Sequence, residues 1–292
     1  MPENRTVMTI TITAIAATIL VMMAGCAGKS AVEDAKEEIV PTHTSTPFTS
    51  PLTFASPVEL PTPRASGATC SPEAWLHNEN GVKRYGDDDL DGAIAEWETA
   101  LETDPACADA YYNLGRAYYE QEKYVDALHQ LQEAVRLAPM IGVTHHNLGL
   151  TYAALGQMEE AKSAFEVAIQ LEPEYLDAYF NLGVVDYTLG NYDEAVFDFE
   201  NVIVARRNDV YALYNLGLAL YARGDNERAI ETWEETVGLS PVYAEALYGL
   251  GLAYRDQGDV GKAREAFQRC IDVAPDAPVA NDARRELERT GP

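Results

Sequence analysis

An acidic stretch at residues 86–98 has the residue types and the spacing to bind a divalent cation. It reads GDDDLDGAIAEWE, with Asp87, Asp89 and Asp91 at alternate positions, Gly92 next and Glu98 last. This order matches the D-x-[DN]-x-[DN]-G-x5-E pattern of a twelve-residue calcium loop. In such a loop the carboxylates surround the ion and the glycine makes the sharp turn. Whether this chemistry is available depends on the elements that hold the stretch.

Those elements recur along the chain with a period of 34 residues. Glycines occur at 81, 115, 149, 183, 217 and 251, and alanines at 93, 127, 161, 195, 229 and 263. A proline closes five of the six units, and Arg207 takes its place in the fourth. Self-similarity at a fixed period of this length indicates a solenoid of stacked helix pairs. A large apolar residue lies four positions after each of these alanines: Trp97, Leu131, Phe165, Phe199, Trp233 and Phe267.

The units also share a motif on their first helices. It reads Tyr111-x-x-Leu114-Gly115-x-x-Tyr118 in the second unit, and His145-x-x-Leu148-Gly149-x-x-Tyr152 and Leu247-x-x-Leu250-Gly251-x-x-Tyr254 repeat it. These residues resemble the tetratricopeptide repeat (TPR) family. The resemblance implies an all-α fold, a right-handed superhelix (α-solenoid) of six helix-turn-helix repeats over 74–275. The expected repeats are 74–107, 108–141, 142–175, 176–209, 210–243 and 244–277, with a C-terminal capping helix at 277–290.

The repeat changes the interpretation of the acidic stretch. Aligned on the period, residues 87–93 lie over 121–127 and 155–161, the turn between the two helices of a unit. A calcium loop needs residues 87–95 to wrap around the ion, whereas the repeat needs 91–95 to be helical. We therefore expect no metal site but an acidic turn in which Asp89 caps the second helix. A weak surface cation site at Asp87, Asp89 and Asp91 is the alternative.

The resemblance also implies a binding surface, because the first helix of each TPR unit lines the concave face. Asn amides there could pair with the main chain of an extended peptide, and Tyr side chains supply contact area at low entropic cost. The alternative is that these residues are ordinary family consensus and partly core. The predicted partner-binding residues are Tyr112, Asn113, Arg116, Tyr119, His146, Asn147, Phe180, Asn181, Tyr187, Tyr214, Asn215, Tyr221, Tyr248 and Arg255.

The N-terminal residues predict export and a tether. An uncharged run from Thr6 to Ala24 ends at Met23-Ala24-Gly25-Cys26, which resembles the lipobox of bacterial lipoproteins. The resemblance implies a signal peptide at 1–25, lipidation of Cys26, and a lipid-anchored protein of the cell membrane or outer membrane that faces out of the cytoplasm. An uncleaved transmembrane anchor of about 19 residues is the alternative. The Pro/Ser/Thr-rich residues 26–73 are expected to form a disordered tether.

Charge and cysteine usage narrow the partners. The chain carries a net charge of −26, and residues 1–73 hold only 4 of its 21 basic and 7 of its 47 acidic residues. A body this acidic repels phosphate backbones, so nucleic acid is a poor partner. An exported protein permits disulfides, and Cys70 and Cys107 both precede first helices that should pack side by side, which predicts a bridge between them. Cys270 is expected to be a free thiol in the core.

No motif of a catalytic nucleophile, a phosphate loop or a zinc site appears in a fitting context, so we expect neither an enzyme nor a cofactor. The leading hypothesis is a membrane-tethered TPR scaffold or adaptor that binds an envelope protein or an extended peptide through the concave face. The alternative is a solute-binding lipoprotein that captures a glycan or oligopeptide on the same face. A calcium-dependent adhesion or signalling module is a third hypothesis.

Overall fold

The computed structural model describes residues 70–291, in which every regular element is an α-helix. The expected signal peptide, Cys26 and nearly all of the expected tether lie outside the described residues. Within residues 70–291, no helix combines the length and the apolar character needed to cross a bilayer.

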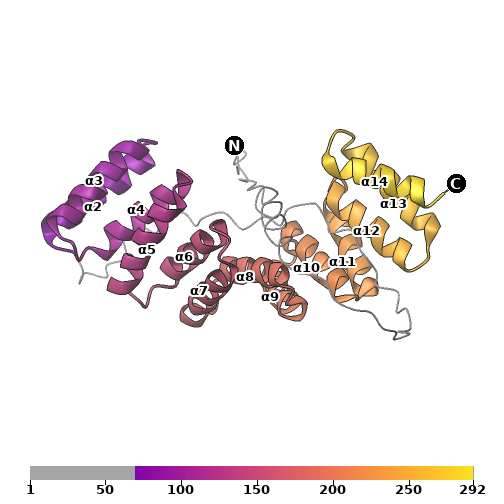
Figure 1. Ribbon diagram of the computed structural model, residues 1–292, viewed down its shortest axis with the longest axis horizontal. Coiled ribbons are helices and arrows are strands. Elements are labelled where there is room, and N and C mark those ends of the chain that lie inside the picture. Colours follow the sequence, from indigo (N-terminus) through magenta and orange to yellow (C-terminus); the bar gives the residue numbers. More distant parts are fainter. Residues whose placement is uncertain (1–69, 292) are drawn as a thin grey trace, which may run out of the picture. The chain divides into compact units, whose positions relative to one another are not determined.

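The helices follow one another as pairs in chain order, with one further helix at the end (Figure 1). α2 begins ahead of residue 74, where the first repeat was expected to start. The helix bounds are α2 Pro72–Gly86, α3 Leu90–Thr103, α4 Ala108–Glu120, α5 Tyr124–Leu137, α6 Gly142–Ala154, α7 Met158–Leu171, α8 Leu176–Leu189, α9 Tyr192–Ala205, α10 Val210–Arg223, α11 Asn226–Leu239, α12 Ala244–Asp256, α13 Val260–Val273 and α14 Pro278–Arg289.

The two helices of each pair approach closely because a glycine on the first meets the large apolar residue on the second. A Cβ added to Gly217 would lie 2.2 Å from Trp233 Nε1, and one added to Gly115 would lie 2.7 Å from Leu131 Cγ. The side chains of Trp233 and Leu131 are completely buried. The 34-residue period of these residues therefore sets the spacing between the two helices of each unit.

The turn inside each pair needs a left-handed residue. Glycine supplies it in the last four pairs, for example Gly224 with φ 90°, whereas Asp88 (φ 62°) and Glu122 (φ 59°) take the position in the first two. The acidic stretch is thus an inter-helix turn. Asp89 Oδ1 accepts a hydrogen bond from Gly92 N at 3.0 Å and caps α3. Because α3 begins at Leu90, residues 90–95 are already helical and cannot wrap around an ion as a calcium loop requires.

The pairs stack as two layers with different neighbours. We call α2, α4, α6, α8, α10 and α12 the first layer, and α3, α5, α7, α9, α11 and α13 the second layer. Within residues 70–291, the backbones of successive first-layer helices come into contact, whereas the backbones of second-layer helices of different pairs do not, and long side chains bridge them instead, as in Arg228 with Glu200. The stack therefore curves locally with the first layer on its inner side. α14 packs on α12 and α13 and covers the last pair.

A disulfide joins the first two pairs. Cys70 and Cys107 are bonded, with their Cα atoms 4.3 Å apart, and this is the pairing that the sequence predicts. Cys70 lies immediately before α2 and Cys107 is the N-cap of α4, so the bond ties two first-layer helices together at their starts. Cys270 is free and buried, and burial raises the pKa of its thiol to about 12.

Candidate functional site

The predicted partner-binding residues lie on the first-layer helices α4, α6, α8, α10 and α12, but most of them are not open to solvent. Only Tyr119, Tyr187, Tyr221 and Arg255 are partly exposed. The expectation that the whole set faces outward is wrong, because most of these side chains lie in the contact between repeats. The buried members are Tyr112, Asn113, Arg116, His146, Asn147, Phe180, Asn181, Tyr214, Asn215 and Tyr248.

The asparagines of this set bond to the preceding repeat. Asn113 Nδ2 donates to Asn78 Oδ1 at 2.9 Å, and Asn147 Nδ2 donates to the Tyr112 hydroxyl at 3.1 Å. In both cases the acceptor lies 35 residues earlier, on the neighbouring first-layer helix. These amide donors therefore hold successive repeats together. They are not free to pair with the main chain of an extended peptide, as the sequence had suggested.

The third asparagine uses a histidine as its acceptor. Asn181 Nδ2 lies 2.8 Å from Nε2 of His146, whose Nδ1 lies 3.0 Å from the Tyr175 hydroxyl. Because the amide donates to Nε2, the ring proton of neutral His146 is assigned to Nδ1, which donates to Tyr175. His146 is completely buried, and burial lowers its pKa to about 4. The imidazole is therefore an uncharged structural link between repeats at neutral pH.

The fourth asparagine breaks this pattern. Asn215 would reach back to Phe180, which offers no acceptor, and its Nδ2 instead donates to Tyr211 O of its own helix at 2.9 Å. Its Oδ1 is buried and has no hydrogen-bond partner. The chain of side-chain hydrogen bonds along the first layer is thus interrupted between the fourth and fifth repeats.

Two tyrosine hydroxyls are also used between repeats. Tyr85 donates to Glu120 Oε1 at 2.6 Å, and Tyr221 donates to Asp256 Oδ2 at 2.6 Å. Burial, with the Glu120 carboxylate as the next cause, raises the pKa of Tyr85 to about 12. The predicted site residue Tyr221 therefore contributes to assembly as well as to the surface.

The two arginines of the predicted set have different surroundings. Arg255 bonds Asp256 at 2.7 Å and Glu286 of α14 at 2.5 Å. Arg116 has one hydrogen bond, from Nη2 to Glu120 Oε1 at 3.2 Å, while its buried Nε and Nη1 have no partner. Its Cζ lies 5.9 Å from the centre of the Tyr85 ring. The same position in later repeats is aliphatic and buried, namely Leu150, Val184, Leu218 and Leu252. Arg116 is therefore a departure from the period with unused donors.

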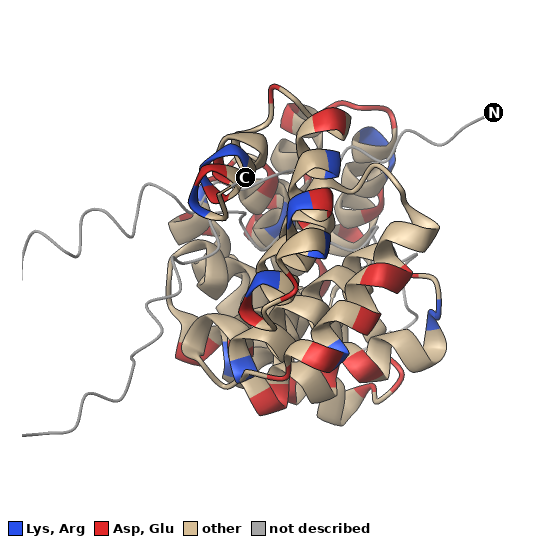
Figure 2. Cartoon of the chain, turned by 90° about the vertical axis from the view of Figure 1, so that its right-hand side faces the viewer, with Lys and Arg blue, Asp and Glu red and all other residues tan. Residues whose placement is uncertain are grey.

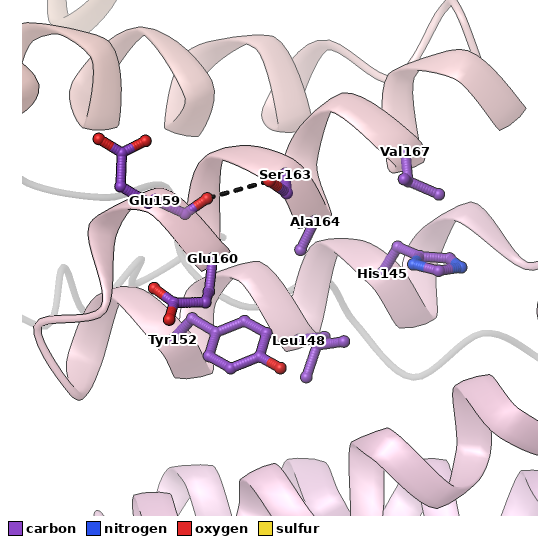
Figure 3. Close-up of a pocket in the computed structure, with 8 residues that line it drawn as sticks. All are labelled: His145, Leu148, Tyr152, Glu159, Glu160, Ser163, Ala164 and Val167. Carbon is purple, nitrogen blue, oxygen red and sulfur yellow. Dashed lines mark hydrogen bonds between the residues drawn. The ribbon is translucent and has the colours of Figure 1, made fainter.

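Hollows that the sequence did not predict lie between the first and second helices of three repeats. The hollow of the third repeat, between α6 and α7, has a volume of about 410 Å³ (Figure 3). Figure 3 shows Tyr152 and Glu160 on one side of it and His145 and Val167 towards the other. Corresponding hollows lie at the fourth repeat, about 340 Å³, and the sixth, about 270 Å³. The lining of the first of these is His145, Leu148, Tyr152, Glu159, Glu160, Ser163, Ala164 and Val167.

Acidic positions occur on many of the helices and turns (Figure 2). Several are paired, as in Arg206 with Asp177 at 2.8 Å and Arg228 with Glu200 at 2.6 Å. Acidic residues outnumber basic ones more than twofold in the whole chain. The field around the described residues is therefore expected to favour cationic or neutral partners.

A family model described as tetratricopeptide repeat matches residues 81–139, 146–211 and 214–278. The chain belongs to the tetratricopeptide repeat family. Its fold is an all-α solenoid, as the motif spacing predicts. No protein among the curated ones matches the sequence.

Solved TPR structures share this arrangement. YrrB, described as a TPR protein with an unusual peptide-binding site, is 24% identical with a TM-score of 0.59, over 65% of this chain and 97% of its own. PilW, described as a type IV pilus biogenesis factor, is 18% identical with a TM-score of 0.61, over 73% and 98%. A MamA structure is 27% identical with a TM-score of 0.53, over 55% and 94%. At these identities the first two establish likeness of fold alone.

Proposed function

We propose that this TPR protein is a membrane-tethered, non-catalytic scaffold that binds an extended peptide segment or a protein partner in the cell envelope through its first layer. Membership of the TPR family supports an interaction role. The peptide-binding site in the description of YrrB and the pilus role in that of PilW are consistent with it. Tethering rests on the lipobox-like residues that end at Cys26.

The observation that carries the binding surface is Arg116. A buried guanidinium with unsatisfied N–H groups is costly, and burial of a charge without full compensation is rare unless a ligand completes it. The aliphatic residue of the other repeats would fill the same position without that cost. Two oxygens of a bound segment, such as main-chain carbonyls, would be needed to satisfy Nε and Nη1, because these two groups lie on different edges of the guanidinium. The partly exposed rings of Tyr119 and Tyr187 offer contact area on the same layer.

The test is crosslinked affinity capture of the full-length chain from its own membranes, with Arg116→Leu beside the wild type. Leu is the residue of the third, fifth and sixth repeats at this position, so the fold should be kept. Arg136→Leu is the matched control, because it removes the same charge from a side chain that is 62% exposed on the second layer. We expect Arg116→Leu to reduce recovery of a specific partner about tenfold, equivalent to about 1.4 kcal/mol, and Arg136→Leu to leave it unchanged. Equal recovery with all three chains would contradict a first-layer site.

The tether has its own test. The wild type should incorporate a clickable fatty acid and Cys26→Ala should not, because the acylated residue is lost. Membrane association of a wild-type chain that incorporates no fatty acid would support the uncleaved anchor instead.

Loss of a purified glycan or oligopeptide ligand, rather than of a protein, on Arg116→Leu would favour the solute-binding alternative.

A further inference from the structure

The hollow of the fourth repeat differs from its counterparts in the charge of its walls. The hollows of the third and sixth repeats can be compared with it directly, because equivalent positions of the 34-residue repeat line all three. This hollow lies where α7, α8 and α9 meet. It is lined by Lys162, Glu166, Leu182, Asp186, Asp193, Glu194, Phe197 and Asp198.

Two wall positions have gained a carboxylate. Asp186 stands where the third and sixth repeats have Tyr152 and Tyr254, and Asp198 stands where both have alanine. In Figure 3, which shows the third repeat, Tyr152 and Ala164 occupy these positions in the wall. The fourth repeat has thus replaced a ring and a methyl group by two acids on facing helices.

The two acids have unequal partners. Asp186 is 1% exposed, and its Oδ1 accepts from Lys162 Nζ at 2.6 Å and Asn191 Nδ2 at 2.8 Å. Asp198 is 4% exposed and has neither a hydrogen bond nor an ion pair with any residue of the described part of the chain. Burial, and next the charge of Asp186, raise the pKa of Asp198 to about 8. Lys162 is therefore the single lysine in a lining that holds several acidic residues, and it pairs with Asp186. Asp198, which is also buried, has no cationic partner within residues 70–291.

An exposed aromatic ring lies beside the unpaired acid. Phe197 lines the hollow and is 62% exposed, where the third repeat has Ser163 and the sixth has Glu265. An acidic side chain next to an accessible ring is a favourable environment for an organic cation, which gains a cation–π contact and, as the acid gives up its proton, an ion pair. Lys162 shows that an alkylammonium group fits against this wall.

We propose that the fourth-repeat hollow binds a lysine or arginine side chain of a partner protein, whose cationic group pairs with Asp198 and lies against Phe197. Asp198 and Phe197 belong to α9 of the second layer, and no residue of α4 lines the hollow, so the site does not depend on Arg116. The net charge of −26 would draw a basic partner to it from a distance. The same chemistry could come from a free polyamine, and the experiment separates the two sources.

The first arm uses p-benzoylphenylalanine in place of Phe197, which keeps an aromatic ring, in the full-length protein in its own cells. Irradiation should crosslink it to protein segments that carry lysine or arginine next to the linked residue. Adding Asp198→Ala, which restores the alanine of the third and sixth repeats, should reduce that product at least tenfold. Adding Glu160→Ala, which removes one carboxylate from the third-repeat hollow of Figure 3, should leave it unchanged. Equal loss with both variants, or linked segments without basic residues, would overturn the proposal.

The second arm titrates the purified protein with putrescine, and separately with Ca²⁺, and follows the amide signals of α8 and α9 by NMR. Under the proposal neither saturates these signals below millimolar concentration, because the partner chain supplies the remaining contacts. Micromolar binding of putrescine that Asp198→Ala abolishes would make this a polyamine site. Micromolar binding of Ca²⁺ with the same sensitivity would make it a metal site. Either result would overturn docking of a partner side chain.

Discussion

The first and second layers of the solenoid use their polar side chains in different ways. In the first layer Asn113 and Asn147 bond the repeat before them, and His146 links Asn181 to Tyr175. In the described residues, the backbones of second-layer helices of different pairs do not come into contact, although long side chains such as Arg228 and Glu200 pair between them. The outward residues of these helices border hollows whose chemistry changes from one repeat to the next.

This difference follows from neighbours. A first-layer side chain meets another repeat on either side, so a polar group there must find a partner inside the stack. Apart from the side chains that pack against the first layer, second-layer residues border solvent or the hollows, so substitution there costs little and can follow a ligand. Recognition features are then expected where a repeat departs from its own period, as at Arg116 in the first layer and Asp198 in the second.

The largest effect is expected from the bond that joins two first-layer helices. The Cys70–Cys107 bridge closes a loop with a sequence separation of 37, which by chain entropy corresponds to about 4 kcal/mol. The double variant Cys70→Ala/Cys107→Ala should therefore lower the free energy of unfolding of the first two pairs, as measured by hydrogen exchange in α2–α5. Unchanged protection there would show that first-layer contacts suffice without the crosslink.

Gly217→Ala tests the contact between the layers. The new Cβ would meet the indole of Trp233, which is completely buried and cannot move aside without disturbing the next repeat. Overpacking of this kind should cost about 3 kcal/mol, measured by denaturant unfolding. A loss below about 0.5 kcal/mol, within the range of ordinary surface substitutions, would mean that the layers can separate to accept the methyl group.

Asp198→Ala should stabilise the second layer in a pH-dependent way. The pKa of Asp198 is about 8 in the folded protein and near 3.8 when unfolded, so between these values the native state holds a proton that the unfolded state has released. Native stability therefore falls as the pH rises from about 4 to about 8, and the variant lacks this fall. We expect the free energy of unfolding of the variant to exceed that of the wild type by roughly 2 kcal/mol at pH 8. This difference should shrink towards pH 4. Parallel stability curves would contradict a buried, protonated Asp198.

His146→Phe provides the opposite case in the first layer. The pKa of His146 is about 4 when folded and near 6.5 when unfolded, so the unfolded state takes up a proton first as the pH falls. The wild type should lose roughly 1–2 kcal/mol between pH 6.5 and pH 4.5 that the variant keeps. Asn181 would turn to its own helix, as Asn215 does opposite Phe180. Thermal unfolding over this pH range measures the difference, and equal acid sensitivity of the two proteins would exclude His146 as the cause.

The period alone was enough to predict the helix pairs, the capping role of Asp89 and the nearness of Cys70 to Cys107. These features depend on which residues recur, and they need no knowledge of side-chain direction. The exposure of the asparagines could not be predicted in this way. Whether Asn113 is free depends on an acceptor 35 residues earlier, and the motif does not state that Asn78 will present one.

The fourth-repeat hollow was missed for a different reason. The predicted site residues belong to positions that recur with the period, whereas the signal at this site is a residue that departs from it. Comparison of Asp198 with Ala164 and Ala266 on the second helices would have identified the position from the sequence. Its burial and lack of a partner depend on how α8 and α9 pack, which only the structure shows.

The smallest expected effect comes from Gly238→Ala, which compares the second layer with the first by the same substitution. Gly238 is exposed near the end of the second-layer helix α11, and a Cβ added there meets nothing within 4 Å. Gly238→Ala should therefore stabilise the protein by about 0.5 kcal/mol, because alanine restricts the unfolded chain and favours the helix. The same substitution would then have opposite signs at Gly217 and Gly238, measured in one denaturant series. A loss at Gly238 would mean that the second layer is as closely constrained as the first, and the freedom to vary that we assign to its outer surface would have no basis.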